Sequence, residues 1–411
     1  DPAIICGVEP DDDGFESANL GMRGSRQLSA DIELSGNLLV AETETEFDGG
    51  FVNETEQRQT TASLDLDWAV TARWQSRFTL GRSTDDSDNL LDGTKRSEFD
   101  TTRLDFRWQN DVSLGHGHLL TAGIDVLRDE VDSTADFTVD DRETVGTFIQ
   151  HQWAGTQWST QASLRYESFG EGFDDPRPGG DEFDNETTGN IGLGYGINEN
   201  LRAFASYGTG FRAPDFNELF FPGFGNPDLD PEESETLEIG IKGVAGPARW
   251  EVTAFHTEVD DLIALDPTFT PQNIDEAEIE GVELAVDADL DQWRLAANVG
   301  IKDTEDNDTG NQLPRRADET LDVSVTRNVG NWSAGAELSY QGERFDDAGN
   351  TDQLDSYTLL DLRAQWQVAR DSKANFKVNN VTDEDYRLTG IHNRDDRNFT
   401  AQLEWRPGTN R

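Results

Sequence analysis

The sequence of 411 residues predicts an all-β fold, a transmembrane antiparallel β-barrel of about 19 strands. Three observations lead to this prediction. Segments in which apolar and polar residues alternate recur from Phe15 to Trp405. Short turns and longer acidic loops separate these segments in regular succession, as the two ends of a membrane barrel require. No stretch approaches the roughly 18 consecutive apolar residues of a transmembrane helix.

The strand segments have a clean two-residue period, which places apolar side chains on one face and small or polar side chains on the other. The clearest examples are 191–197, 293–301, 332–340 and 399–405. Alternation alone does not say which face is the lumen. A barrel of about 19 strands is too wide for its own side chains to fill. We therefore expect the apolar face, with Leu193, Leu295 and Leu338, to meet lipid.

Short turns rich in Gly, Asn and Asp close one end of the strand pairs, because these residues adopt the positive φ of tight turns. They are predicted at 26–29, 113–117, 155–157, 198–200, 244–247, 289–291, 328–331 and 369–372. Trp158, Trp250, Trp293 and Trp332 follow four of them. Tryptophans beside short turns fit an interfacial aromatic girdle, although strand-end aromatics are also common in soluble β-sandwiches.

Longer loops are predicted at the other end of the strands. They span 49–57, 85–98, 133–141, 170–185, 213–234, 265–275, 303–313, 344–353 and 391–397. These loops hold a large part of the acidic residues. Runs of charge are usually solvated surface, and we assign most of these acids that role.

The charge of the chain restricts its partners. With 83 acidic and 33 basic residues, the net charge is -50, which repels nucleic acid and anionic membrane surfaces. The 22 Phe and 10 Trp residues, together with the strand alternation, argue against disorder. A dense acidic surface with very few lysines is typical of salt-loving organisms, since salt screens the self-repulsion. We therefore expect a halophilic source.

Residues that carry catalysis are scarce. The five histidines show no zinc spacing, and no catalytic constellation can be argued from their positions. Cys6 stands alone, so an intramolecular disulfide is impossible. We therefore do not expect an enzyme.

One long segment, 207–243, organises the rest of the chain. It reads YGTGFRAPDFNELFFPGFGNPDLDPEESETLEIGIKG, two alternating strands joined by a loop. Four prolines in the loop prevent a helix or a central strand from running through it. The motif resembles a signature of the TonB-dependent outer-membrane receptors, and within that family it is most similar to the vitamin B12 (cobalamin) receptors. A generic β-hairpin with a long loop is the plainer alternative.

Other segments support the resemblance. They are IEGVE at 279–283, LPRR at 313–316 and NNVTDEDY at 379–386. The last strand, 398–405, ends on an aromatic residue, but 406–411 follow it where family barrels usually stop.

The resemblance implies a 22-stranded barrel of which this chain holds strands 4 to 22. We expect an extracellular loop remnant at 1–14, a partial barrel at 15–406 and a C-terminal tail at 407–411. A plug domain, a TonB box and a signal peptide are not found in the sequence. We therefore expect a processed, truncated or incomplete chain.

The resemblance also implies a calcium site. Cobalamin receptors use a D-x-D-G-F loop, matched here by Asp11 and Asp13, with an acid from the next loop, matched by Asp48. Glu54 is a weaker match, because the family more often has Asp there. Carboxylate oxygens are the ligands that calcium prefers. With 83 acids in the chain, a chance match is the open alternative.

The function implied is TonB-dependent uptake of cobalamin or a similar large nutrient through the outer membrane. Phe220, Phe221 and Phe224 would supply apolar contacts to the ligand, although loop aromatics more often pack on neighbouring loops. The expected partners are TonB, through an N-terminal region outside this chain, and outer-membrane lipid, with no nucleic acid. A siderophore receptor, which needs no calcium loop, and a passive porin-like barrel, which needs no 207–243 motif, are the alternatives.

Overall fold

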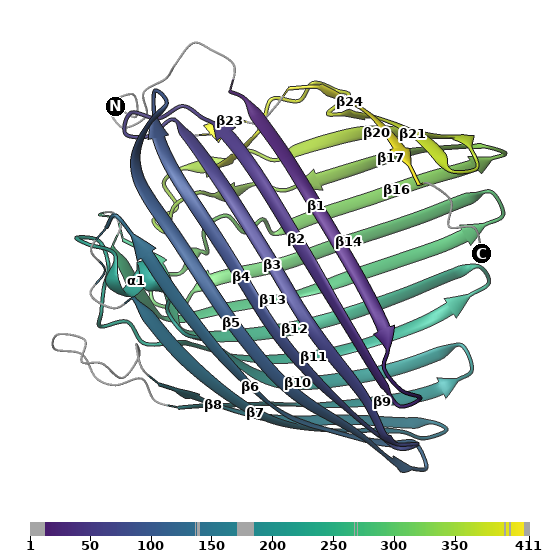
Figure 1. The fold of residues 1–411 in the computed structure, drawn as a ribbon. Helices are drawn as coiled ribbons and strands as arrows, with labels where there is room; N and C mark the ends of the chain where they lie inside the picture. Colours follow the sequence, from purple (N-terminus) through teal and green to yellow (C-terminus); the bar gives the residue numbers. More distant parts are fainter. Residues whose placement is uncertain are drawn as a thin grey trace.

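The computed structural model describes residues 13–135, 137, 140–170, 185–266, 268, 270–389, 392–393 and 396–406. Most of these residues form one large antiparallel sheet in which each long strand pairs with the next long strand along the chain (Figure 1). The strands of this sheet are β1 (Phe15–Gln27), β2 (Ile32–Glu46), β3 (Glu54–Thr71), β4 (Trp74–Leu91), β5 (Thr94–Gly115), β6 (His118–Ser133), β7 (Asp141–Ala154), β8 (Trp158–Phe169), β9 (Glu186–Asn198), β10 (Leu201–Arg212), β11 (Glu232–Ala245), β12 (Ala248–Leu265), β13 (Pro271–Leu290), β14 (Trp293–Asp306), β15 (Asn311–Gln312), β16 (Glu319–Val329), β17 (Trp332–Gln341), β20 (Tyr357–Ala369), β21 (Ser372–Asn379) and β24 (Asn398–Trp405).

The sheet has 20 strands, of which β15 is only two residues long. The remaining strands confirm the prediction of about 19 strands in an antiparallel barrel. Two small hairpins lie outside the sheet, β18 (Arg344–Phe345) with β19 (Gln353–Leu354) and β22 (Arg387–Thr389) with β23 (His392–Asn393). Among the described residues, β1 pairs only with β2 and β24 pairs only with β21, so these two strands are the edges of the sheet.

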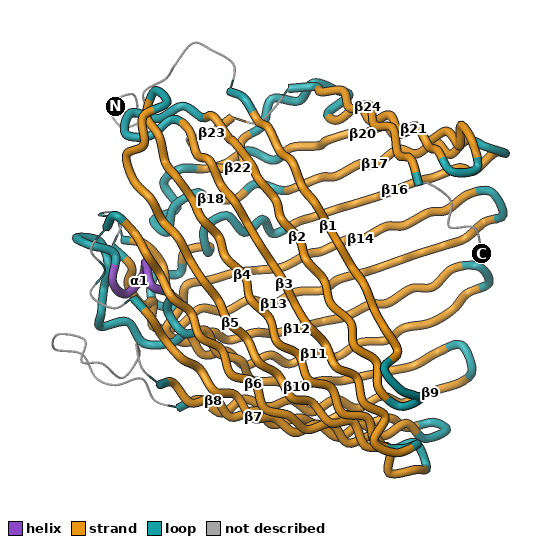
Figure 2. Tube along the Cα trace, viewed as in Figure 1, coloured by secondary structure: helices purple, strands orange, loops and turns teal. Residues whose placement is uncertain are grey.

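The single helix in the described part of the chain is α1 (Phe216–Phe220). Figure 2 shows it in purple at the end of the sheet away from the short turns. No helix of the described residues is long and apolar enough to cross a membrane.

Short turns join the strands at one end, as predicted. The eight predicted turns all lie at strand junctions, and a ninth, at 72–73 between β3 and β4, was not predicted. The loop predicted at 85–98 is wrong. There β4 and β5 stay paired as far as Leu91 and Thr94, and only Asp92 and Gly93 form the turn. Their φ angles of 51° and 68° match a tight two-residue hairpin turn, for which Asp-Gly is a strong signal.

The strand register defines two faces, because directly opposed residues in antiparallel strands point to the same side. Leu193 opposes Ala205, Leu295 opposes Val325, and Leu338 opposes Leu360. All of these belong to one apolar face that continues across the sheet. Many of its large apolar side chains are exposed, Leu193 at 47% among them, which is the arrangement of a lipid-facing surface. The other face is therefore assigned to the lumen.

The lumenal face is polar and held by charge pairs. Arg165 on β8 donates to both oxygens of Asp125 on β6, at 2.9 and 2.7 Å, and also to Glu167 at 2.8 Å. Gly146, on the strand between them, leaves the space for this pair, because a Cβ there would overlap the guanidinium. Charged side chains that are paired in this way can line the lumenal side of the sheet, for which apolar side chains are unsuited.

Candidate functional site

The connection from β10 to β11 folds around α1. This helix fits between Pro214 and Pro222, so the prolines bound a short helix rather than preventing one. Asp215 caps it: the Glu218 backbone N–H donates to the Asp215 carboxylate at 2.8 Å, and the Asp215 N–H donates to the Glu218 carboxylate at 2.7 Å. This capping box stabilises the first turn of a helix that is too short to persist alone.

Arg212 fastens both ends of this connection. It donates to the carboxylate of Glu218 at 3.0 and 3.1 Å and to that of Glu232 at 2.9 and 2.8 Å. Glu232 also accepts from the Ile263 N–H at 2.8 Å. Burial by itself would raise the pKa of Glu232, but the bonds from Arg212 and Ile263 outweigh it and lower that pKa. The clamp therefore favours an ionised Glu232.

An apolar cluster lies beneath the connection. Phe216, Leu219, Phe220 and Leu229 are buried against Val131 of β6 and Phe169 of β8. Burial of several large side chains supplies most of the free energy that holds such a segment in place. The part of the 207–243 motif around α1 thus specifies how the loop folds.

Charged side chains of the lumenal face tie α1 to the wall. Arg142 on β7 lies 4.6 Å from the ring centre of Phe216 and donates to the Pro214 carbonyl at 3.2 Å. Asp129 on β6 accepts from Arg142 at 3.2 Å and from Arg103 on β5 at 2.6 Å. These three charged residues oppose one another in strand register. Arginine over an aromatic ring adds a cation–π attraction to the packing.

The three predicted ligand-contacting phenylalanines differ in exposure. Phe220 is 7% exposed and belongs to the buried cluster, whereas Phe221 and Phe224 are 40% and 50% exposed. The ring centroid of Phe221 lies 6.2 Å from that of Phe224 and 6.0 Å from that of Phe137. The ring centroids of Phe137 and Phe99 are 5.8 Å apart. The structure therefore forms an aromatic row of four rings. We did not predict Phe137; its signal was one Phe in an otherwise acidic loop.

A hollow of about 390 Å³ lies beside Phe216 on the lumenal face. Its lining includes Gln59, Asp85, Arg103, Asp129 and Arg142. Gln59 donates to Asp85 at 2.9 Å, so much of the lining is already hydrogen-bonded within the wall. The mouth thus offers exposed rings above a polar hollow, a combination suited to a ligand with apolar and polar parts.

The predicted calcium ligands are only partly placed. Asp11 lies outside the described residues, Asp13 and Asp48 are exposed, and Glu54 is half-buried. The loop end beside Asp13 is anchored, because the Gly14 N–H donates to the Glu46 carboxylate at 2.9 Å. In the described ranges, Asp13, Asp48 and Glu54 do not converge as a metal-binding group. The calcium site stays a prediction.

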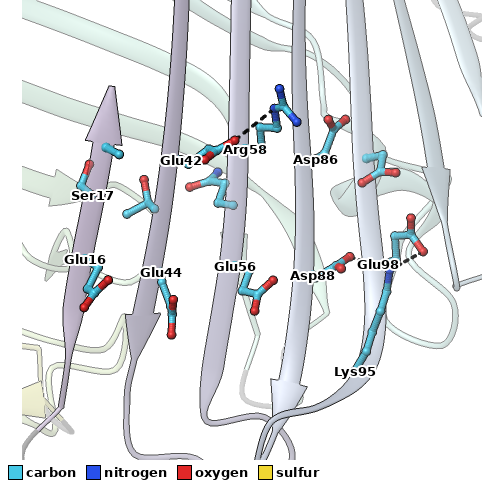
Figure 3. Close-up of a pocket in the computed structure, with 14 residues that line it drawn as sticks. Glu16, Ser17, Glu42, Glu44, Glu56, Arg58, Asp86, Asp88, Lys95 and Glu98 are labelled. Atoms are coloured by element: carbon cyan, nitrogen blue, oxygen red, sulfur yellow. Dashed lines mark ion pairs between the residues drawn. The ribbon is translucent and has the colours of Figure 1, made fainter. Parts of the chain in front are cut away.

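Near these residues, the apolar face ends in an acidic rim on β1 to β5 (Figure 3). We define the acidic rim as Glu16, Glu42, Glu44, Glu56, Asp86, Asp88, Glu98 and Asp100, with the bases Arg58 and Lys95. Register places all of them on the apolar face, beyond the apolar band. The pKa of Glu44 is raised by desolvation and by the neighbouring carboxylates of Glu54, Glu16 and Glu56.

Fold and site together define an outer-membrane β-barrel with a fastened loop at its mouth, the class to which nutrient receptors belong. The family model for the TonB dependent receptor-like β-barrel matches residues 10–381. The chain belongs to this family, which consists of outer-membrane receptors and not of enzymes.

Two proteins of similar sequence carry the same name. The chain is 28% identical over 412 residues to a protein named "Vitamin B12 transporter BtuB" from Photobacterium profundum, covering 97% of this chain and 66% of that protein. It is also 28% identical to a protein of the same name from Vibrio vulnificus, covering 76% of this chain and 51% of that protein. The chain thus spans between half and two thirds of the length of these relatives.

Solved structures share the fold. The copper transporter OprC superposes with a TM-score of 0.79 at 16% identity, covering 95% of this chain and 74% of that one. The siderophore receptor PirA from Acinetobacter baumannii superposes with a TM-score of 0.78 at 12% identity, covering 96% and 71%. At these identities the likeness concerns the fold alone.

Proposed function

We propose that this chain is the barrel of a TonB-dependent receptor that takes up cobalamin across the outer membrane. The observation that carries the proposal is the likeness to a protein named as a vitamin B12 transporter along 97% of the chain. A siderophore receptor is the second candidate. The siderophore receptors among the solved structures support it less, because their identities to this chain are low.

In this proposal the mouth holds the ligand through fixed and exposed parts of one loop. The Arg212 clamp and the buried cluster hold the loop in place, which lowers the entropy that binding would otherwise cost. Phe221 and Phe224 present their rings to the apolar parts of the ligand, and Phe220 anchors them from below. The hollow beside Phe216 offers hydrogen-bonding groups to polar amides. TonB would act through a region outside these 411 residues.

We further propose that calcium orders the neighbouring loops. Asp11, Asp13, Asp48 and Glu54 would share the ion, whose charge would cancel the repulsion between their carboxylates. Loops brought together before the ligand arrives lose less entropy on binding. Calcium and cobalamin would then tighten each other's binding by the same factor, because linkage is reciprocal.

The first experiment measures cyanocobalamin binding by outer membranes that contain the complete gene product. We expect Phe221→Ala with Phe224→Ala to weaken binding about tenfold, as loss of exposed aromatic anchors does. The control is Phe376→Ala, which removes a ring of similar exposure from the lipid-facing side of β21. Equal affinities of the double variant and the wild type would contradict the role of the two rings.

The second experiment repeats the titration with and without millimolar calcium, and with Asp11→Ala and Asp48→Ala. We expect calcium to tighten binding by the wild type and to have little effect on either variant. Identical affinity under all conditions would exclude the calcium site while leaving cobalamin as the ligand. Binding of a ferric chelate in place of cobalamin would instead assign the protein to the siderophore receptors.

A further inference from the structure

A cluster of one histidine and three carboxylates lies on β12 and β13, outside the connection of residues 213–231, which we call the mouth loop. His256 directly opposes Glu280, and Glu258 directly opposes Glu278 in the strand register. All four side chains share the face that carries the apolar band. Leu237 opposes His256 and Val282 opposes Ala254, so the cluster lies where the strands leave that band.

The potential donor atoms lie slightly farther apart than the ligands around one bound metal ion. His256 Nδ1 lies 3.5 Å from Glu278 Oε1 and 3.7 Å from Glu280 Oε2. The potential ligand atoms of these three residues all lie within 4.8 Å of one another. Two ligands bound at about 2.1 Å to one ion stand about 3.0 to 3.4 Å apart at octahedral or tetrahedral angles. Small side-chain rotations would therefore complete the site.

Glu258 orients the imidazole of His256. Its carboxylate lies 3.1 Å from His256 Nε2 on the other side of the ring. An ionised carboxylate only accepts hydrogen bonds, so Nε2 must carry the proton. In the neutral ring, Nδ1 then presents its lone pair toward Glu278 and Glu280. A histidine whose far nitrogen donates to a carboxylate is the usual arrangement of a metal ligand in proteins.

The cluster holds more carboxylates than bases. Among the ion pairs of the described residues, His256 is the only basic partner of Glu258, Glu278 and Glu280. A divalent cation bound between these carboxylates would reduce their mutual repulsion. The Glu280 side chain is 60% exposed, which leaves an open approach from solution and room for a water ligand.

We propose that His256, Glu278 and Glu280 bind a divalent metal ion such as Zn²⁺ on the outer face of the barrel, with Glu258 positioning the imidazole. One nitrogen and two oxygen donors suit metals of borderline softness better than calcium or magnesium. The ion links β12 to β13 beyond the apolar band. The site is separate from the mouth loop, so it does not depend on the identity of the transported ligand.

The test uses the complete protein, purified in detergent and stripped of metal with a chelator. Zn²⁺ is titrated against a chromophoric competitor in high salt with millimolar Mg²⁺, which occupies nonspecific carboxylates. We expect one tight Zn²⁺ per chain in the wild type. We expect that site to be lost in His256→Ala and weakened about tenfold or more in Glu258→Gln, the variant of the positioning residue. Circular dichroism and unheated gel mobility show whether each variant is folded.

Two control variants distinguish the proposed site from nonspecific Zn²⁺ binding by other acids or histidines. Glu44→Gln removes an acid from the acidic rim, and His151→Ala removes one member of a histidine pair on β6 and β7, in which His118 Nδ1 lies 3.1 Å from His151 Nε2. Both should keep the tight site. The proposal is wrong if His256→Ala keeps it, if Glu44→Gln loses as much affinity as His256→Ala, or if only His151→Ala loses it.

Discussion

The lumenal wall and the acidic rim are both dense in carboxylates, but they handle the charge differently. On the wall, Asp125 and Glu167 share Arg165, and Asp129 lies between two arginines. On the rim, eight acids share two bases. Lys95 contacts Asp88 and Glu98, and Arg58 lies 3.6 Å from Glu42.

Access to water explains the difference. The Asp129 side chain is 12% exposed, whereas that of Glu42 on the rim is 61% exposed. A carboxylate that has lost most of its water must be compensated by a nearby cation and hydrogen bonds. An exposed carboxylate keeps its hydration, and a salt bridge there adds little. The same residue type is thus part of the architecture in one region and part of a solvated surface in the other.

The largest effect is expected when one arginine is removed from each region. Arg165→Ala should lower the free energy of unfolding by about 2 kcal/mol, because it leaves Asp125 and Glu167 without their cation. Arg58→Ala should change it by less than about 0.5 kcal/mol. Denaturant unfolding in detergent, followed by circular dichroism, measures both. Equal changes in the free energy of unfolding would show that arginines stabilise the lumenal wall and the acidic rim to the same extent.

Acid should affect the clamp of the mouth loop and the acidic rim in opposite directions. The lowered pKa of Glu232 means that its stabilising contribution is present above its ordinary pKa and is lost as the pH falls through the lowered value. The raised pKa of Glu44 means that its ionised form costs stability, and this cost disappears as the pH falls through the raised value. The rim should therefore relax before the mouth loop loosens.

Pepsin cleavage between residues 213 and 231, measured as the pH is lowered below about 4.5, reports the loosening of the loop. Glu232→Gln should make that segment susceptible already at the upper end of this range. The comparison fails if cleavage of the wild type and of Glu232→Gln depends on pH in the same way.

The smallest effect is expected from neutralising the rim. Glu44→Gln should raise the midpoint of thermal unfolding slightly at low ionic strength, since it removes one of several like charges. At about 1 M salt, where the Debye length is about 3 Å, the gain should vanish. Thermal unfolding at the two salt concentrations measures it. A gain that persists in high salt would show that the rim acids act through contacts and not through their field.

The alternation of residues was enough to predict the fold, the number of strands and most of the turns. A two-residue period is a local property, and each strand carries its own lipid-facing pattern, so no knowledge of its partners is needed. The β4–β5 hairpin was missed because its acids suggested a loop. The Asp92-Gly93 pair was the better local signal.

The mouth loop was predicted as a unit, but not the roles of its residues. Phe220 and Phe221 are neighbours with the same side chain, yet one is buried and the other is exposed. Phe220 is the last residue of α1 and Phe221 is its C-cap, so the two side chains point in different directions. Only the packing of α1 against β6 and β8 decides which ring meets solvent.

The sequence by itself determined that this protein is an antiparallel membrane barrel with one long loop between two strands, because periodicity, turn residues and the long motif are all read along the chain. Only the tertiary structure decided which charges meet. His256 reaches Glu278 and Glu280 through the register of two strands, more than twenty residues apart in sequence. Arg142 reaches Phe216 across the lumenal face. Register and loop packing are set by the whole sheet, since a shift of one residue would move every side chain to the opposite face.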